Sequence, residues 1–308
     1  MIYILGHKNP DTDSVSSVIA YSDFLKKEGK NAEPITLGKI NNETKFVLDY
    51  FGIKIPEIKT ELPQNAEVIL LDHNEKKQSI DNLDDLNLIE VIDHHKINLK
   101  TEKPINVCIK PLGSSCTLIA EKFLEKNIDI SSQIAGLLIA GIISDTLFFR
   151  SPTTTEKDKD ILKKLNKIAK IENLEEFSLN MFQAKSDLGN IKVEDLIQLD
   201  YKEFDFNGHR WGIGVMETTN KQYALERKKE IKEKLKLLKK RNNLEGVIFT
   251  IIDILEEKSW TILAEENEKN VFQKVFSAVD EEGLLFVDKL VSRKKQIVPK
   301  LEDYFRSK

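Results

Sequence analysis

Short apolar runs alternate with amphipathic segments through the first half of the chain. Four of these runs are rich in β-branched residues and have few polar interruptions, which is typical of strands buried on both faces of a sheet. The four runs are Ile2–Leu5, Ile35–Leu37, Val68–Leu71 and Ile89–Ile92. Between the first two, Ser14–Glu28 carries apolar residues at helical spacing. This strand–helix–strand order predicts a parallel sheet with right-handed crossovers.

Four further helices are predicted before residue 187, and the pattern then changes. We expect these helices over Ser115–Lys126, Ser131–Ser144, Thr155–Ile171 and Leu174–Ala184. After a polar segment, two strand-like runs flank Asn207-Gly208, which is a strong hairpin signal. A helix is predicted next over Lys221–Arg241, followed by strands over Val247–Leu255 and Trp260–Ala264.

These patterns predict an α/β fold with two domains. Residues 1–187 form an N-terminal domain, in which a mainly parallel sheet is flanked by helices. Residues 188–194 are the linker and hinge, and residues 195–308 form a smaller α/β domain with a mixed sheet. A chain of 308 residues is long enough for each domain to have its own hydrophobic core.

Composition and charge exclude several classes of protein. The chain is 40% hydrophobic and 32% charged, which argues against general disorder. Lys and Arg number 47 against 51 Asp and Glu, so no basic field predicts nucleic-acid binding. The longest apolar stretch, Ile134–Ile143, is about half as long as a membrane span. Cys108 and Cys116 are interpreted as reduced thiols, and the N-terminus as a strand without a signal peptide. We therefore expect a cytoplasmic protein without a membrane partner.

Aspartates and histidines gather where the predicted strands end, and Asp145, at the end of a predicted helix, could approach the same edge from the side. In open parallel sheets, ligands bind beside the carboxyl ends of the strands, so these side chains are expected at one edge. Any one of them could simply end a turn, and Asp13 could cap the helix that starts at Ser14. Several carboxylates at one place, however, need positive charge to offset their repulsion. The candidate residues are His7, Asp11, Asp13, Asp72, Asp93, His94, His95 and Asp145.

The side-chain types indicate which cations would bind. A set rich in carboxylates, with some imidazole and no thiolate, favours Mn²⁺ or Mg²⁺ over zinc or an iron–sulfur centre, with Co²⁺ as a substitute. The set is too large for one ion but suits two ions about 3.5–4 Å apart, as in two-metal phosphohydrolases. The residues alone therefore predict a two-metal phosphohydrolase.

Four motifs resemble those of one known family. Gly6–Asp13 reads GHKNPDTD, and DHN, DHH and SRKKQ follow at Asp72–Asn74, Asp93–His95 and Ser292–Gln296. Together they resemble the manganese-dependent family II inorganic pyrophosphatases of the DHH phosphoesterase superfamily, over nearly the whole chain. The resemblance implies a DHH metal-binding catalytic domain followed by a DHHA2-type substrate-binding domain. It also implies hydrolysis of pyrophosphate to two orthophosphates, two Mn²⁺ per subunit with additional Mg²⁺ entering with the substrate, and a homodimer formed through the N-terminal domain.

The resemblance also implies a role for each site residue. One cation would be held by His7, Asp11, Asp72 and Asp145, and the other by Asp13, Asp72, His94 and Asp145. Asp72 and Asp145 would thus bridge the cations and, with His95, form the catalytic group around a bridging hydroxide nucleophile. The substrate would be bound by His95, Lys202, Arg293 and Lys294. His73 and Asp93 would orient the metal ligands from behind.

Four alternatives remain beside a pyrophosphatase. A short-chain exopolyphosphatase is the nearest, because its second domain is related. A DHH-type phosphodiesterase acting on oligonucleotides or cyclic dinucleotides would carry a glycine-rich GGGH-type segment, which this sequence lacks. A non-catalytic metal or nucleotide sensor predicts loss of a ligand or of a substrate cation, and none is missing. A nucleic-acid-binding module disagrees with the net charge of −4.

Overall fold

The computed structural model describes residues 1–189, 191–281 and 283–307. It divides into two compact units, Met1–Lys185 and Ser186–Lys308, which are described separately below. The predicted linker 188–194 includes residue 190, which lies outside the described residues. Within that linker, Val193 begins a helix and is buried in the core of the second unit.

The first unit contains a parallel sheet of six strands in the order β3-β2-β1-β4-β5-β6. The strands are β1 (Ile2–Leu5), β2 (Ala32–Thr36), β3 (Glu57–Ile58), β4 (Glu67–Leu71), β5 (Asn87–Asp93) and β6 (Asn106–Ile109). The four predicted strands are β1, β2, β4 and β5, whereas the short outer strands β3 and β6 were not predicted. The strand order runs outward in both directions from β1 and β4, which makes a switch point where ligands bind in such sheets.

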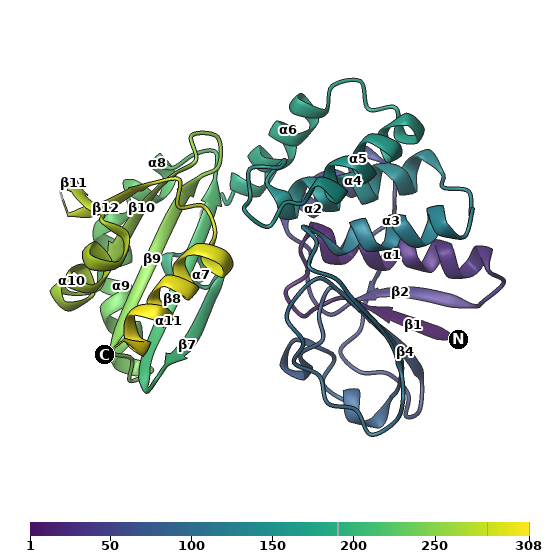
Figure 1. Ribbon diagram of the computed structural model, residues 1–308, viewed down its shortest axis with the longest axis horizontal. Helices are drawn as coiled ribbons and strands as arrows, with labels where there is room; N and C mark the ends of the chain where they lie inside the picture. The colour runs from purple at the N-terminus through teal and green to yellow at the C-terminus, as the bar shows by residue number, and fades with distance from the viewer. Residues whose placement is uncertain (190, 282, 308) are drawn as a thin grey trace. The chain divides into compact units, whose positions relative to one another are not determined.

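Helices cover this sheet, and α1 packs against α3 and α4 (Figure 1). The helices are α1 (Thr12–Lys27), α2 (Asn42–Tyr50), α3 (Ser115–Glu125), α4 (Ser132–Thr146), α5 (Glu156–Ala169) and α6 (Leu174–Ser186). Nearly every residue of α4 is buried, as expected for a helix that is apolar all round. Two short 3₁₀ turns, Lys76–Gln78 and Leu83–Asp85, lie between β4 and β5.

The start of α1 corrects one prediction. The residue that caps this helix is Asp11, whose Oδ1 accepts a hydrogen bond of 2.9 Å from the Ser14 amide. Asp13 does not cap it, because it already lies inside the first turn of α1, with its carboxylate bound elsewhere. The predicted start of α5 is correct: Thr155 and Asp158 form a reciprocal capping box.

The second unit contains a mixed sheet of six strands in the order β11-β12-β10-β9-β8-β7. Only β8 and β9 run parallel, and the other neighbours are antiparallel. The strands are β7 (Tyr201–Phe206), β8 (His209–Thr218), β9 (Gly246–Asp253), β10 (Lys258–Leu263), β11 (Val279–Glu281) and β12 (Leu284–Asp288). Asn207 and Gly208 have φ angles of 56° and 90°, as the predicted hairpin turn requires.

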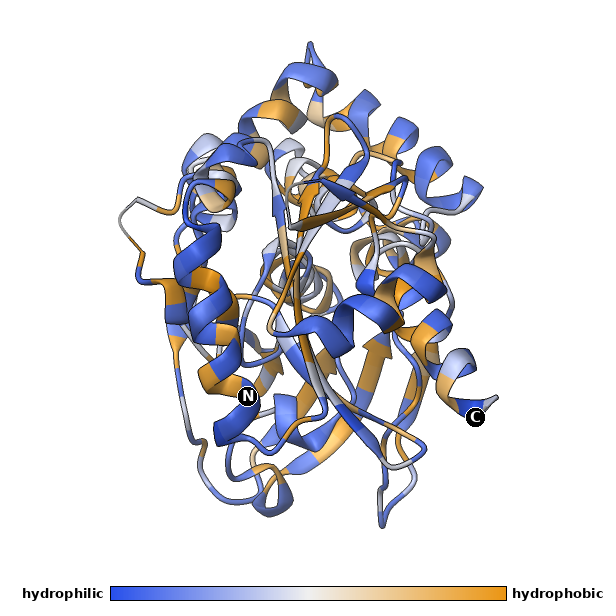
Figure 2. Cartoon of the chain, turned by 90° about the vertical axis from the view of Figure 1, so that its left-hand side faces the viewer, coloured by the Kyte–Doolittle hydropathy of each residue, from blue (hydrophilic) through white to orange (hydrophobic). Residues whose placement is uncertain are grey.

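The helices of the second unit differ in two respects from the prediction: one predicted helix is divided, and several further helices were not predicted. The segment predicted as one helix forms two, α8 (Gln222–Leu225) and α9 (Lys228–Arg241). The others are α7 (Val193–Gln198), α10 (Glu266–Phe276), the π-helical turn η3 (Arg293–Ile297) and α11 (Val298–Arg306). Hydrophobic residues concentrate on the strands and on one side of the helices (Figure 2). Within the described residues, no helix combines the length and the apolar character needed to cross a membrane. The predicted α/β fold class is confirmed.

Candidate metal centre

The predicted ligands lie at the ends of strands and helices and come close together in the first unit. His7 follows β1, Asp72 follows β4, and His94 and His95 follow β5, while Asp11 and Asp13 stand at the start of α1 and Asp145 near the end of α4. Three groups of these residues place their ligand atoms within 4.8 Å of one another. The groups are His7, Asp11 and Asp72; Asp13, His94 and Asp145; and Asp72, His94 and His95.

Asp72 connects two of these groups. Its Oδ2 lies 3.3 Å from His7 Nε2, and its Oδ1 lies 3.4 Å from His94 Nε2. The Ser115 hydroxyl donates a 2.9 Å hydrogen bond to the same Oδ1. Asp72 itself has φ 63°, in the left-handed region that Asp tolerates better than most residues. This turn directly after β4 allows a buried carboxylate to face both histidines.

His94 is oriented as a metal ligand would be. Its Nδ1 lies 3.0 Å from the carbonyl oxygen of Leu112, which accepts a hydrogen bond from that nitrogen. Its buried Nε2 has no hydrogen-bond partner among the residues that the structure describes. This Nε2 lies 3.4 Å from Oδ1 of Asp72 and 3.4 Å from Oδ2 of Asp145. A ring nitrogen that is oriented in this way, between carboxylate oxygens, is well placed to bind a divalent cation.

Asp13 is held by the N-terminus of α3. Its Oδ2 accepts 2.7 Å from the Ser115 amide, while its Oδ1 accepts 2.6 Å from the Ser114 hydroxyl and 2.9 Å from the Cys116 amide. These donors and the helix dipole stabilise a negative charge that is completely buried. The roles of Ser114 and Ser115 were missed in the sequence, where the only available signal was a serine pair preceding a predicted helix.

Crowded carboxylates leave this cluster in need of positive charge. Burial, together with the charges of Asp72 and Asp145, raises the pKa of the Asp13 carboxyl well above its usual range. Burial likewise raises the pKa of Asp145 to about 6. Burial lowers the pKa of the His94 imidazole, but its interactions with Asp145 and Asp72 outweigh this effect and raise it well above its usual value. Two divalent cations would supply this charge, so the residues fit a two-metal centre.

Asp93 fixes the orientation of His95. Its Oδ1 accepts hydrogen bonds from the backbone amides of His94 (2.7 Å) and His95 (3.0 Å), and lies 2.8 Å from His95 Nδ1. Its Oδ2 accepts a bond of 2.5 Å from Asn74 Nδ2. The His95 side chain is 40% exposed, and its Nδ1 lies 3.9 Å from Oδ1 of Asp72. Its exposure leaves it open to a substrate.

His73 is a buried neighbour of the cluster. Its Nδ1 lies 2.9 Å from the carbonyl oxygen of Leu71, and its ring is edge-on to that of His7 at 6.4 Å. Burial lowers the pKa of His73 to about 4, so the ring is neutral near pH 7. The structure therefore places a neutral, buried ring beside His7, one of the candidate ligands.

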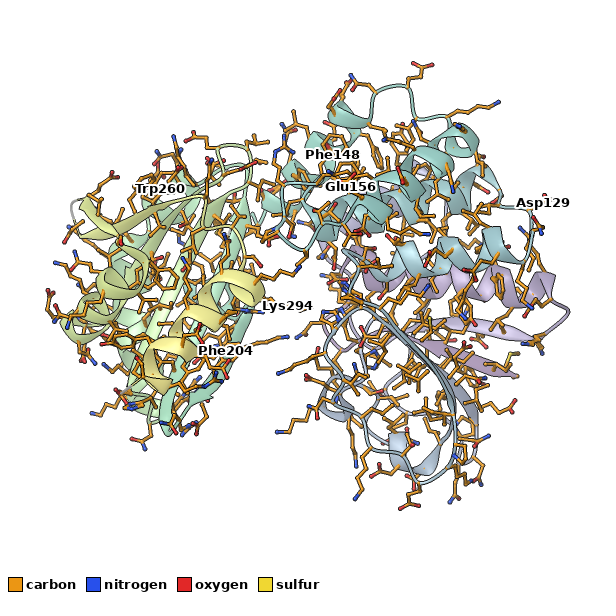
Figure 3. The ribbon with its side chains drawn as sticks, viewed as in Figure 1. Asp129, Phe148, Glu156, Phe204, Trp260 and Lys294 are labelled. Carbon is orange, nitrogen blue, oxygen red and sulfur yellow. The ribbon has the colours of Figure 1, made fainter. Side chains whose placement is uncertain are left out.

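The three predicted substrate cations lie in the second unit. Lys202 is an exposed residue of β7, and Arg293 and Lys294 begin the turn η3, where Figure 3 labels Lys294. The Arg293 guanidinium donates 2.6 Å to Oδ1 of Asp200 and 2.7 Å to the Asp200 carbonyl. It also donates 3.5 Å to the carbonyl of Ile213, the residue paired with Lys202 across β7 and β8. The structure therefore brings Arg293 beside the strand position of Lys202.

Comparisons with known proteins identify the family. Residues 1–142 match the N-terminal domain of the DHH family, and residues 179–304 match the DHHA2 domain. The chain is 43% identical to a manganese-dependent inorganic pyrophosphatase of Methanocaldococcus jannaschii, covering 98% of both chains. It is 40% identical to a manganese-dependent inorganic pyrophosphatase of Bacillus subtilis, again over 98% of both chains. The chain belongs to the family of manganese-dependent inorganic pyrophosphatases.

Solved structures with a similar fold support the same family assignment. A Methanococcus jannaschii protein described as a family II inorganic pyrophosphatase superposes with a TM-score of 0.84 at 42% identity, covering 99% of this chain and 100% of that one. An exopolyphosphatase-related protein of Bacteroides fragilis shares the fold, with a TM-score of 0.52 at 17% identity, covering 99% of this chain and 93% of that one. The family resemblance drawn from the four sequence motifs is confirmed. Both predicted domain types of this pyrophosphatase family are present.

Proposed function

We propose that this chain is an inorganic diphosphatase that hydrolyses pyrophosphate to two orthophosphates at a centre of two divalent cations. Asp72 carries the proposal, because its two carboxylate oxygens face two different histidines, His7 and His94. One carboxylate can therefore take part in both cation sites, as two-metal hydrolases require. The names of relatives that are about 40% identical over nearly the whole chain support pyrophosphate as the substrate and Mn²⁺ as the cation.

We assign the ligands as the sequence motifs implied. One cation is held by His7, Asp11, Asp72 and Asp145, and the other by Asp13, Asp72, His94 and Asp145. The groups of His7, Asp11 and Asp72 and of Asp13, His94 and Asp145 support the core of each set, and the 3.4 Å between His94 and Asp72 supports Asp72 as a member of the second. Mn²⁺ is preferred, Co²⁺ and Mg²⁺ are substitutes, and additional Mg²⁺ enters with the substrate. When bound, the two cations would lower the pKa of a shared water molecule so that hydroxide is available as the nucleophile, and they would withdraw charge from the phosphoryl group under attack.

The other residues of the chain position the substrate and the ligands. His95 contacts the bridging or leaving oxygen of pyrophosphate as an acid or hydrogen-bond donor, with its ring oriented by Asp93. Asp93 and His73 also orient the side chains that bind the cations. Lys202, Arg293 and Lys294 bind the phosphates, Arg293 as a planar fork and the lysines as point charges. Phosphoryl transfer depends mainly on such positioning and on electrostatic stabilisation.

The domain organisation belongs to the same proposal. Residues 1–187 are the metal-binding catalytic domain, residues 188–194 the hinge, and residues 195–308 the substrate-binding domain. We further propose a homodimer formed through the N-terminal domain. The edge strand β6, which pairs with β5 and has Val107 51% exposed, offers backbone groups for such pairing. A cytoplasmic location is supported by the two free thiols, Cys108 and Cys116.

The test is a metal titration followed by a substrate comparison. Metal-stripped protein receives Mn²⁺, Co²⁺, Mg²⁺ or Zn²⁺, and phosphate release from pyrophosphate is measured for each. We expect Mn²⁺ to restore the highest activity. The Mn²⁺-loaded protein is then offered pyrophosphate, tripolyphosphate and a dinucleotide at equal concentration. Faster release from tripolyphosphate would instead identify an exopolyphosphatase, and cleavage of the dinucleotide a phosphodiesterase.

A further inference from the structure

A buried glutamate lies behind the metal centre without being one of its proposed ligands. Glu43 is in the first turn of α2 and is completely buried. Burying a carboxylate is costly unless specific hydrogen bonds satisfy it. The position near the N-terminus of α2 offsets part of this cost through the helix dipole. An apolar side chain would pack between the surrounding helices at a lower cost in free energy, so a buried carboxylate at this position suggests a specific role.

The partners of Glu43 stand next to proposed metal ligands on two different helices. Its Oε2 accepts a 2.8 Å hydrogen bond from the Thr12 hydroxyl at the start of α1, and a 2.8 Å bond from the Ser144 hydroxyl near the end of α4. Thr12 lies between Asp11 and Asp13 in the sequence, and Ser144 directly precedes Asp145. One oxygen therefore joins two segments that are more than 100 residues apart along the chain.

The end of α4 needs such support. Directly after Thr146, three successive residues adopt left-handed backbone conformations: Leu147, Phe148 and Phe149, with φ of 49°, 48° and 70°. This conformation is unfavourable for side chains of that size. Asp145 thus lies in the last turn of a helix that ends in a strained segment. The bond from Ser144 to Glu43 anchors this turn one residue away from the ligand.

We propose that Glu43 is a positioning residue that clasps Thr12 and Ser144 and so sets the spacing of Asp13 and Asp145. These two carboxylates belong, with His94, to one group of candidate ligand atoms. A change in their spacing alters most the cation site that takes both Asp13 and Asp145, and it also affects the other site through the shared Asp145. The inference rests on the proposed metal centre and deepens it.

The test measures Mn²⁺ binding to metal-stripped, full-length protein by calorimetry, together with the electron paramagnetic resonance spectrum of the bound Mn²⁺ pair. Glu43→Leu removes the clasp at similar volume, whereas Glu43→Gln keeps a carbonyl oxygen that can accept both hydroxyl bonds. We expect E43L to raise the Kd of the weaker Mn²⁺ by about tenfold or more and to change the coupling between the two ions. E43Q is expected to restore both towards the wild-type values.

The two arms of the clasp give an independent test, which holds even if E43L fails to fold. Thr12→Val and Ser144→Ala each remove one hydroxyl. If the clasp acts as a unit, the double variant weakens Mn²⁺ binding by less than the product of the two single effects. Independent, fully multiplicative effects of T12V and S144A would overturn the proposal, as would a folded E43L with wild-type Mn²⁺ binding and coupling.

Glu268 provides the matched control. It is a buried glutamate of α10 in the second unit, where it completes a capping box with Glu265 and pairs with Lys239 at 2.8 Å. Glu268→Leu should lower stability without changing the Mn²⁺ titration. If E268L lost as much Mn²⁺ binding as E43L, the effect of Glu43 would be a general structural one. Failure of the wild-type protein to hydrolyse pyrophosphate would overturn the proposed function and leave the Mn²⁺ readout for Glu43 standing.

Discussion

The Nε2 atom of His94 lies 3.4 Å from Oδ1 of Asp72 without forming a hydrogen bond to it, although both groups are buried. A buried imidazole nitrogen beside a buried carboxylate normally forms such a bond, because an unsatisfied polar atom is costly. The other ring nitrogen of His94 is occupied by the Leu112 carbonyl, so the ring cannot turn towards a different partner without losing that bond. The arrangement suits an ion that binds both atoms.

Replacing Asp72 tests the bridging role directly. Asp72→Ala removes the carboxylate that faces both His7 and His94, so we expect Mn²⁺ content and pyrophosphate hydrolysis to fall together. The loss of activity should be at least about 100-fold, because groups that only support a ligand already cost 10- to 100-fold. Metal analysis and phosphate release measure the two effects. The exposed Asp81 is the matched control, and D81A should change neither. Retained activity in D72A would contradict the assignment of Asp72 as a shared ligand.

The sequence predicted the edge of the sheet where the cluster forms, because strand ends and polar side chains are both visible in it. His7, Asp72 and His94 follow three predicted strands, and these strands are adjacent in the sheet. The contacts that hold the cluster were not predictable in the same way. Glu43 is a polar residue of the short helix α2, which was not predicted, and the Leu112 carbonyl is a backbone group in a loop, so hydrophobic periodicity marks neither of them. Their importance depends on tertiary contacts between segments far apart in the chain.

Short or irregular elements explain most of the errors in the predicted fold. Strand β3 has two residues, and β6 is an edge strand whose residues are partly exposed, so neither gives a clear apolar run. The helix predicted over Lys221–Arg241 is interrupted near Arg227 although the apolar spacing continues through the break. Spacing of apolar residues reports which face is buried, and it does not report every break in the backbone.

Removing the Ser115 hydroxyl should weaken metal binding without unfolding the protein. Ser115→Ala deletes the 2.9 Å hydrogen bond to Oδ1 of Asp72, so the carboxylate becomes less well oriented. We expect about a tenfold rise in the Kd for Mn²⁺, measured by calorimetry. Ser131 is the control, since it caps α4 through the Ile134 amide at a distance from the cluster. S131A should lower the free energy of unfolding by about 1 kcal/mol and leave the Mn²⁺ titration unchanged. If S115A lowered the free energy of unfolding and left the Mn²⁺ titration unchanged, Ser115 would have no role in metal binding.

Arg293 should affect the use of substrate and not the binding of metal. Arg293→Ala removes a guanidinium proposed to bind phosphate, and a lost charge-assisted hydrogen bond costs about 1.5–3 kcal/mol, or roughly 10- to 100-fold in kcat/KM. The Mn²⁺ titration should stay as in the wild type. Because Arg293 also donates to Asp200, Asp200→Asn serves as the control that loosens the guanidinium without deleting it. If R293A changed Mn²⁺ content and left the kinetics unaltered, the proposed roles of the two domains would be wrong.

Manganese binding should release protons from the two histidines that face Asp72. Burial lowers the pKa of His7 and of His94, but nearby carboxylates outweigh this effect and raise both well above the usual value, which favours protonated rings when no cation is bound. A metal ligand must be a neutral ring, so binding displaces roughly two protons and the affinity for Mn²⁺ rises with pH. Calorimetry in buffers of different ionisation enthalpy counts these protons. A binding enthalpy that is the same in all buffers would mean that no protons are released, and it would contradict the proposed ligands.

The same pKa shifts predict the stability of the metal-free protein. A histidine whose pKa is higher in the folded than in the unfolded state contributes stability that is fully present below about pH 6.5 and is lost as the pH rises through the folded value. The metal-free protein should therefore lose stability towards alkaline pH, whereas the Mn²⁺-loaded protein should not, because the cation then replaces the protons. Urea unfolding at pH 6 and pH 9, with and without Mn²⁺, measures this difference. His94→Gln should reduce both the proton count and the pH dependence. His209→Gln, at a partly exposed histidine of the second unit paired with Glu245, should leave both unchanged.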